Sequence, residues 1–411
     1  MSPAAPLDDE NLLAEILLRL PPLPSTLPRA SLVCKRWLLL VSDIRFFRRF
    51  RRRHRCSPPL PGCFVPDRGG VSYTPTMDSP DRVPAERFSL QLDGSCYSNP
   101  LGCRHGLVPI SPNLWKQVLV WDPVTGDQHH ISFPPGLDGI ANSIHGAVRR
   151  AAGDGEVHHF QVILVGVVEV DKQHVGVLAC VYSSDTGVWD NIISVLIPFD
   201  AYTTRVLKFD LERQSLAEIQ LPVGMSEEEL LQLTVMRAEG GGLGLLYISG
   251  FTTQLWKRKT DCDGAASWGM ERTIELGKLL SLNPEKERVR PLIEGLAEYN
   301  NVVFLTTGDG VIMLQLESLQ FKKFYEMSDG FYHYPFESVY SVDMLLRFLV
   351  EQADAGSFGT ISNWKYNAPQ PSAEQSRMQI ANKRSFLCIC LLVILQLKEH
   401  CILMVLQSEL K

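Results

Sequence analysis

Two pairs of histidines are the residues whose type could most directly do chemistry. His129-His130 and His158-His159 are each adjacent in the sequence, and a neutral imidazole can bind a metal or transfer a proton near neutral pH. Adjacent side chains of a strand point to opposite faces, however, so neither pair can place both rings on one ion. We therefore predict surface histidines, with no metal site and no cofactor.

Motifs for nucleophiles and phosphate binding are missing from the sequence. It contains no Gly-x-Ser-x-Gly elbow, no Walker loop and no His-Glu-x-x-His pair. The cluster Gly240–Gly244 departs from Gly-x-Gly-x-x-Gly and is expected to form a loop between repeated units. With no acid–base pair to propose, the sequence favours a non-catalytic binding protein, with no catalytic residues, over an enzyme.

The cysteines indicate an intracellular protein rather than a zinc or disulfide framework. The chain has 10 cysteines and no Cys-x-x-Cys pair, and Cys56, Cys63, Cys96 and Cys103 are irregularly spaced. Reduced, buried thiols are the expectation. The sequence begins without the basic-then-apolar order of a signal peptide. We expect a cytoplasmic or nuclear location.

Charge divides the chain into a basic head and an acidic body. Residues 1–60 hold 11 Lys+Arg and 5 Asp+Glu, a net charge of +6. Since the whole chain has a net charge of −6, the remaining residues carry −12. An acidic body is a poor partner for nucleic acid. The seven arginines from Arg45 to Arg55 are interpreted as the solvated end of a helix, and a nuclear-import signal is the alternative.

The first fifty residues show helical periodicity. Asp8 and Asp9 can cap a helix whose apolar stripe includes Leu12, Ile16 and Leu20, and Pro21-Pro22 ends it. Ser25 can cap a second helix. The apolar face continues with Val33, Trp37 and Val41. A last helical stretch contains three phenylalanines, Phe46, Phe47 and Phe50.

These residues resemble the F-box. The likeness covers about residues 6–50 and rests on the order Leu7-Asp8-Asp9, Leu12–Pro21 and Leu32-Val33-Cys34-Lys35-Arg36-Trp37. It implies a three-helix bundle that inserts into the Skp-type adaptor of a cullin-RING ubiquitin ligase. By position, the adaptor-facing and packing residues would be Leu7, Ile16, Leu20, Pro21, Leu27, Val33, Cys34 and Trp37. The family usually opens with Leu-Pro, whereas this chain has Pro6-Leu7, which could shift the first contact.

So short a segment cannot bury all of its own apolar side chains. Full burial of one Leu-sized side chain yields about 1.5–3 kcal/mol, so three or four anchors could support binding to a partner. Packing of the helices on the body of the same chain is the alternative.

Beyond this module the pattern changes to short apolar strands. Residues 57–84 cluster Pro and Gly and are expected to form a linker with little regular structure. An apolar strand, an Asp-centred turn and a return strand then recur, as in Val118–Trp121 before Asp122–Asp127, and Val206–Phe209 before Asp210–Gln214. Trp121–Gly126 and Lys208–Leu211 resemble the kelch-like, F-box-associated propellers of plant F-box proteins.

Two segments break the repeat. Only Asp200–Thr204 separate Ile197-Pro198-Phe199 from Arg205, where an inner hairpin is expected. We therefore expect one blade to lack its inner strands and to leave a sheet edge unpaired. Near the C-terminus, the apolar run Phe386–Leu397 is followed by Lys398-Glu399-His400. A membrane-spanning helix needs about 20 apolar residues, so a membrane is not an expected partner. A helix packed on the body, or a tail without a strong function, is favoured.

The sequence thus predicts an α+β multidomain chain: a three-helix F-box (1–56), a linker (57–84), an all-β, propeller-like domain with one blade expected to be incomplete (85–350), and a flexible segment with an apolar tail (351–411). The expected function is substrate recognition in a Skp–cullin–F-box ligase, with an unidentified protein as substrate. Two alternatives stay open: a propeller enzyme that acts on sugars or small molecules, and a degenerate F-box protein without substrate competence.

Overall fold

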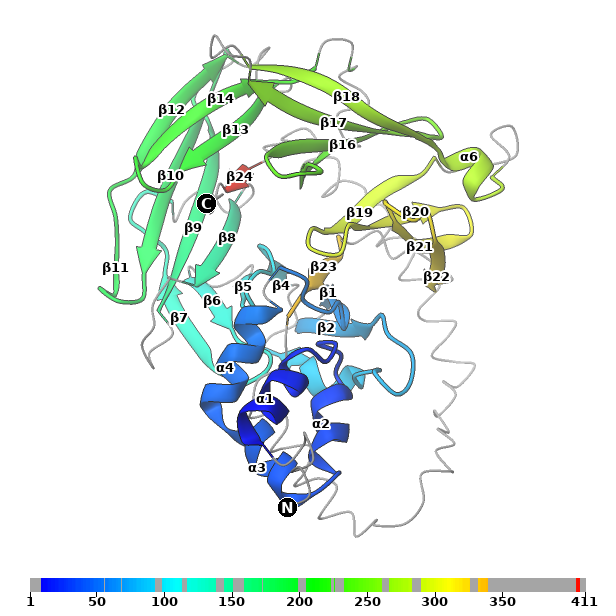
Figure 1. Ribbon diagram of the computed structural model, residues 1–411. Coiled ribbons are helices and arrows are strands. Elements are labelled where there is room, and N and C mark those ends of the chain that lie inside the picture. The colour runs from blue at the N-terminus through cyan, green and yellow to red at the C-terminus, as the bar shows by residue number, and fades with distance from the viewer. Residues whose placement is uncertain are drawn as a thin grey trace, which may run out of the picture.

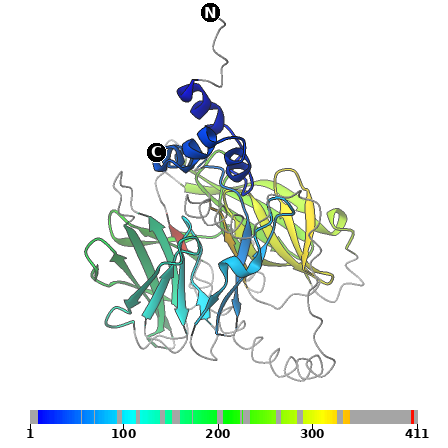
Figure 2. The same ribbon diagram turned by 90° about the horizontal axis from the view of Figure 1, so that it is seen from below.

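The computed structural model describes most of the chain in a series of ranges. They are residues 9–54, 56–67, 69–92, 98–112, 117–137, 144–150, 159–171, 173–198, 205–222, 225, 233–260, 266–282, 290–325, 332–338 and 404–406. Figures 1 and 2 show a group of helices at one side of a ring of β-sheets. Within the ranges just given, no helix is long and apolar enough to cross a lipid bilayer.

Four helices form the N-terminal helical module (residues 9–54): α1 (Glu10–Leu18), α2 (Thr26–Ser31), α3 (Lys35–Ser42) and α4 (Ile44–Arg53). Asp9 caps α1 as predicted, accepting hydrogen bonds from the amides of Asn11 and Leu12 at 2.8 and 3.2 Å. Asp43 caps α4 in the same way, in an extended conformation that separates α3 from α4. This break makes four helices where the resemblance implied three.

The module has its own apolar core. Leu13, Leu17 and Val41 are fully buried, and the three phenylalanines of α4 pack against them. Trp37 and Leu20 lie at the edge of this core and are partly exposed. The periodicity in the sequence therefore identified the module correctly, and Phe46, Phe47 and Phe50 belong to its buried core.

The β-domain consists of sheets that follow one another around the ring (Figure 1). Among the described residues, five sheets have four or five strands and a sixth has three. Apart from one parallel pair described below, paired strands are antiparallel. Most are also adjacent along the chain, and the exceptions are β23 with β1 and β12 with β10.

In chain order, the first three sheets are built as follows. One sheet contains β23 (Tyr334–Phe336), β1 (Gly62–Asp67), β2 (Gly70–Pro75) and β3 (Leu90–Gln91), with the 3-10 helix η2 (Ala85–Phe88) before β3. The next contains β4 (Ser98–Pro100), β5 (Val108–Pro112), β6 (Gln117–Trp121) and β7 (Gln128–Ser132). The third contains β8 (Ile144–Arg150), β9 (Phe160–Glu169), β10 (His174–Ser183), β11 (Val188–Trp189) and β12 (Ile193–Pro198).

The remaining sheets complete the ring. The three-stranded sheet contains β13 (Arg205–Asp210), β14 (Ser215–Gln220) and β24 (Met404–Leu406). It is followed by β15 (Leu233–Arg237), β16 (Leu243–Ser249), β17 (Thr252–Thr260) and β18 (Ala266–Glu275), and then by the short helix α6 (Leu276–Leu279). The last sheet contains β19 (Leu292–Ala297), β20 (Val302–Thr307), β21 (Gly310–Gln315) and β22 (Phe321–Tyr325).

The predicted strand–turn–strand repeat is confirmed, with one correction. The two apolar strands quoted from the sequence, Val118–Trp121 and Val206–Phe209, lie in β6 and β13, and each is followed by its return strand, β7 or β14. The cluster at Gly240–Gly244 does not connect two sheets. Gly240, Gly241 and Gly242 have positive φ and form the turn between β15 and β16 of the same sheet. Glycine allows that tight turn because it has no Cβ to clash.

The predicted linker at residues 57–84 is wrong for its central part. Gly62–Asp67 and Gly70–Pro75 form β1 and β2, which pair in register from Gly62–Pro75 to Asp67–Gly70. β23, from the far end of the domain, pairs with β1 and joins the two ends of the ring. Turn-forming residues hid these strands, because Pro66, Gly69 and Gly70 are normally signals against a strand.

Aromatic side chains pack where the ring closes. The ring of Phe64 on β1 lies 5.3 Å from that of Phe336 on β23, and 5.3 Å from that of Trp121 on β6. All three side chains are buried. Trp121 of the repeat motif therefore packs the closing sheet against its neighbour.

Glu337, directly after β23, fastens the same junction. One carboxylate oxygen accepts hydrogen bonds from the amides of Tyr299 and Asn300 at 2.9 Å and from the Asn300 side chain at 2.8 Å. That side-chain amide also donates to the carbonyl of Pro58 at 3.1 Å. Burial raises the pKa of Glu337 to about 7 despite these bonds.

The short segment before β13 has one of the two expected consequences. Among the described residues the sheet of β13 has three strands, but the edge of β13 is paired rather than open, because the third strand comes from residues 404–406. β24 pairs with β13 in parallel, and the paired residues are Leu207–Met404, Lys208–Val405 and Phe209–Leu406. The favoured helix is thus wrong for residues 404–406, which form a strand, and the run at 386–397 lies outside the described residues.

Candidate docking surface

Large exposed apolar side chains are concentrated in the helical module. Among the described residues, six of the fourteen large hydrophobic residues with high exposure belong to it, although it is a small part of the chain. They are Leu12, Ile16, Leu23, Leu32, Val33 and Leu39. Exposed apolar residues that gather in one small region indicate a binding surface, whereas scattered ones do not.

The eight residues predicted to face or support the adaptor divide into three groups. Ile16, Pro21, Val33 and Cys34 are exposed. Leu27 is buried, and Leu20 and Trp37 pack partly buried against the core of the module, so these three support the surface from below. Leu7 lies outside the described residues.

Helix α1 carries apolar residues on two faces. Leu13 and Leu17 are fully buried, whereas Leu12 and Ile16 are exposed at 44% and 38%. Residues four apart lie on the same face of a helix, so Leu12 and Ile16 form one outward row and Leu13 and Leu17 the inward row. The single stripe expected from the sequence is therefore two, and only one of them is used inside the module.

The connection between α2 and α3 presents the most exposed pair. Leu32 is the C-cap of α2 and Val33 follows it, and these residues are 61% and 60% exposed. Cys34 has φ −165° and ψ 166°, which is extended backbone, and it precedes the first residue of α3. This extended step separates α2 from α3, and Leu32 and Val33 lie exposed in the connection between the two helices.

Four exposed residues were not among the predicted site residues: Leu12, Leu23, Leu32 and Leu39. Leu39, at 72% exposure, is the most exposed large apolar residue of the described chain. The run Leu38-Leu39-Leu40 contained the signal, because three consecutive leucines on a helix cannot all face one core.

The helical module contacts the propeller through its second and last helices. The amide of Ser25 donates to the Asp81 carboxylate at 3.0 Å. On α4, burial lowers the pKa of Arg51, as does the nearby Arg150, while Asp122 acts in the opposite direction. Arg51 therefore lies close to a charged group on the sheets of β4–β8.

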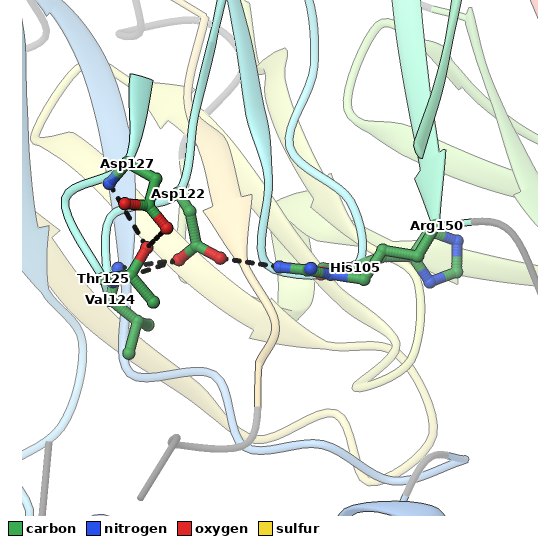
Figure 3. A network of polar contacts seen from close by, with 6 residues as sticks. All are labelled: His105, Asp122, Val124, Thr125, Asp127 and Arg150. Atoms are coloured by element: carbon green, nitrogen blue, oxygen red, sulfur yellow. Dashed lines mark hydrogen bonds and ion pairs between the residues drawn. The ribbon is translucent and has the colours of Figure 1, made fainter. Parts of the chain in front are cut away.

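That group is the polar network in Figure 3. Arg150, the last residue of β8, donates to the Asp122 carboxylate at 2.7 Å and to the carbonyl of His105 at 2.9 Å. The other Asp122 oxygen accepts from the amides of Val124 and Thr125 at 3.0 and 3.3 Å. One aspartate thus holds its own turn, ties two neighbouring sheets together and faces the helical module.

The Asp-centred turn recurs with the same geometry in another sheet. Asp210 accepts hydrogen bonds from the amides of Glu212 and Arg213 at 3.0 Å each, and these bonds lower its pKa. Since Asp210 connects β13 to β14 as Asp122 connects β6 to β7, the repeated motif identified in the sequence has a structural role in turn formation.

The residues first considered for chemistry do not come together. His129 and His130 are exposed on β7, and His159 lies 3.5 Å from Asp185, while His158 lies outside the described residues. No group of three His, Cys, Asp or Glu residues in the described ranges could hold a metal ion. Cys63 and Cys180 are buried, and burial raises the pKa of both thiols, whereas Cys34 and Cys56 are exposed.

Comparisons with known proteins agree with this division of the chain. The F-box domain family matches residues 7–49. Two propeller families match the body: "F-box protein At3g26010-like, beta-propeller" over residues 79–208, and "F-box protein AT5G49610-like, beta-propeller" over residues 197–342.

More distant comparisons add little. No curated protein matches the chain. Among solved structures, the WD40 domain of SCAP from fission yeast aligns at 8% identity with a TM-score of 0.23, over 65% of this chain and 52% of that one. The match therefore spans about half the length of that domain.

Proposed function

Since the chain is a plant-type F-box protein with a β-propeller domain, we propose that it is the substrate-recognition subunit of a Skp–cullin–F-box ubiquitin ligase. The helical module binds a Skp-type adaptor, which connects it to the cullin-RING ligase. The propeller binds a target protein. The protein carries out no covalent step itself and acts in the cytoplasm or nucleus.

The observation that carries the proposal is the surplus of exposed apolar residues on the helical module. Ile16 and Val33, both predicted from the F-box motif, are exposed, and Trp37 supports them from the core. Burial of an exposed Leu-sized side chain contributes up to about 1.5–3 kcal/mol. A few such anchors at the centre of an interface can account for most of its affinity.

The junction between the module and the propeller supports the second half of the proposal. The Ser25–Asp81 hydrogen bond connects the two parts, and Arg51 of α4 lies close enough to Asp122 and Arg150 for their charges to shift its pKa. A receptor that keeps its target at a fixed place near a charged ubiquitin-conjugating enzyme accelerates transfer by proximity alone.

Reconstitution tests the proposal. The full chain should co-purify with a co-expressed Skp-type adaptor and, with cullin and RING subunits added, should capture target proteins when ubiquitination is blocked. A complex that forms but captures no target would support adaptor binding and contradict substrate recognition. Failure of the folded chain to bind any Skp-type adaptor would contradict the whole proposal.

A further inference from the structure

The sheet of β13, β14 and β24 differs from every other sheet in the described chain. Its two consecutive strands, β13 and β14, pair as an ordinary hairpin from Arg205–Gln220 to Asp210–Ser215. The strand on the other side of β13 is β24, which is nearly two hundred residues away in sequence. In the other sheets of the described chain, the corresponding neighbour is the strand that comes just before in the sequence, and the closing sheet adds β23 next to β1.

The preceding segment is too short to supply that strand. β12 ends at Pro198 and β13 begins at Arg205, so residues 199–204 are all that lies between them. A hairpin needs two strands of at least about three residues and a turn of about two. The two propeller families also meet here, one ending at residue 208 and the other beginning at 197. The missing inner strands therefore coincide with the junction of two family patterns.

An empty position beside β13 would expose a sheet edge over a buried core. Val206, Leu207 and Phe209 are almost completely buried, and they join the apolar clusters on both sides of the sheet. Unpaired amides and carbonyls at such an edge invite pairing with other chains. A fold that lacks these strands thus needs a substitute to cover the edge.

We propose that the C-terminal segment Met404–Leu406 is this substitute, an intramolecular donor strand that completes the blade of β13 and β14. The register Leu207–Met404, Lys208–Val405 and Phe209–Leu406 places three consecutive residues against the middle of β13. The sequence around them, Cys401-Ile402-Leu403-Met404-Val405-Leu406, is apolar and suits a strand at a buried position. The edge of β13 is therefore a β-strand addition site, which this chain fills with its own tail.

Hydrogen exchange of the full chain tests the proposal. Amides of β13 that do not face β14 should be protected in the full chain and should exchange at least about tenfold faster when residues 399–411 are deleted. The amides that face β14 serve as an internal control and should change less. A folded deletion variant that keeps full protection along Arg205–Asp210 would overturn the proposal.

A second variant keeps the test decisive if the deletion prevents folding. Successive N–H groups of a strand point to alternate sides, so the double change Val405→Pro and Leu406→Pro removes one donor toward β13 in either orientation. It should reproduce the faster exchange, whereas Ser408→Pro with Glu409→Pro should not. Equal exchange in the two proline variants would contradict the donor strand. Dimerisation of the deletion variant through this edge would support it.

Discussion

The helical module and the propeller place the same residue types in opposite environments. In the propeller, Leu119 of β6 and Phe304 of β20 are fully buried between neighbouring sheets. In the module, Leu39 and Val33 are mostly exposed, although the module has a core of its own. A ring of sheets can bury both faces of each strand, whereas four short helices can bury only one face each. Apolar residues beyond that limit are available for a partner.

The largest expected effect is on adaptor binding. Ile16→Asp places a charge on the outward row of α1 and should weaken binding to a Skp-type adaptor at least about a hundredfold, because a desolvated charge at an apolar interface costs several kcal/mol. Leu196→Asp is the matched control, since Leu196 is 54% exposed on β12 of the propeller. Titration calorimetry should show a loss for the first variant alone. Equal losses in both would remove the distinction between the two regions.

The next effect is on the stability of the module. Leu17→Ala removes a fully buried side chain from its core and should lower the free energy of unfolding by about 2–5 kcal/mol. Leu12→Ala, on the outward row of the same helix, should change it by less than about 0.5 kcal/mol. Chemical denaturation monitored by circular dichroism measures both. Similar values for the two variants would contradict the division of α1 into an inward and an outward face.

A smaller effect is expected from the polar network that faces the module. Asp122→Ala removes the acceptor of two turn amides and of Arg150, and leaves that half-buried guanidinium without its carboxylate. We expect a loss of about 1–3 kcal/mol in propeller stability. The exposed Asp210→Ala loses a similar turn but no ion pair, and should cost less. A thermal melt in which Asp210→Ala is the less stable variant would contradict the role of Arg150.

The smallest effect is a pH dependence of ring closure. The pKa of Glu337 is raised to about 7 by burial, so the folded chain keeps its proton at pH values where the unfolded chain has lost it. Stability from this group is complete below the ordinary glutamate pKa and is lost as pH rises through about 7. Glu337→Gln should flatten the change in melting temperature between pH 5 and about 7.5. An unchanged pH profile in the variant would exclude Glu337 as its source.

The sequence predicted the parts whose local signals agree with their final environment. Asp9 before an apolar periodic run, and Trp121 before Asp122 in a turn, have the same role in the structure as in the prediction. β1 and β2 were missed because their prolines and glycines act against a strand locally, and because one edge of β1 pairs with β23, far away in sequence. Local patterns cannot reveal a partner that closes a ring.

The candidate docking surface could be predicted only in part, because a sequence motif does not show which of its residues are exposed. The F-box motif identified Ile16 and Val33, which are exposed, together with Leu27, which is buried. Motif positions are shared by residues that contact a partner and residues that support them, and exposure is needed to tell them apart. Leu32 and Leu39 were missed because their exposure depends on how α3 and the α2–α3 connection pack against the rest of the module.

The most direct test of the central claim is the affinity of the full chain for a Skp-type adaptor before and after the change Val33→Asp. Val33 is 60% exposed, so the substitution leaves the core of the module unchanged. We predict that the variant keeps the melting temperature of the unmodified chain and loses adaptor binding. Undiminished binding by a folded Val33→Asp variant would show that the exposed apolar residues of the module are not the docking surface.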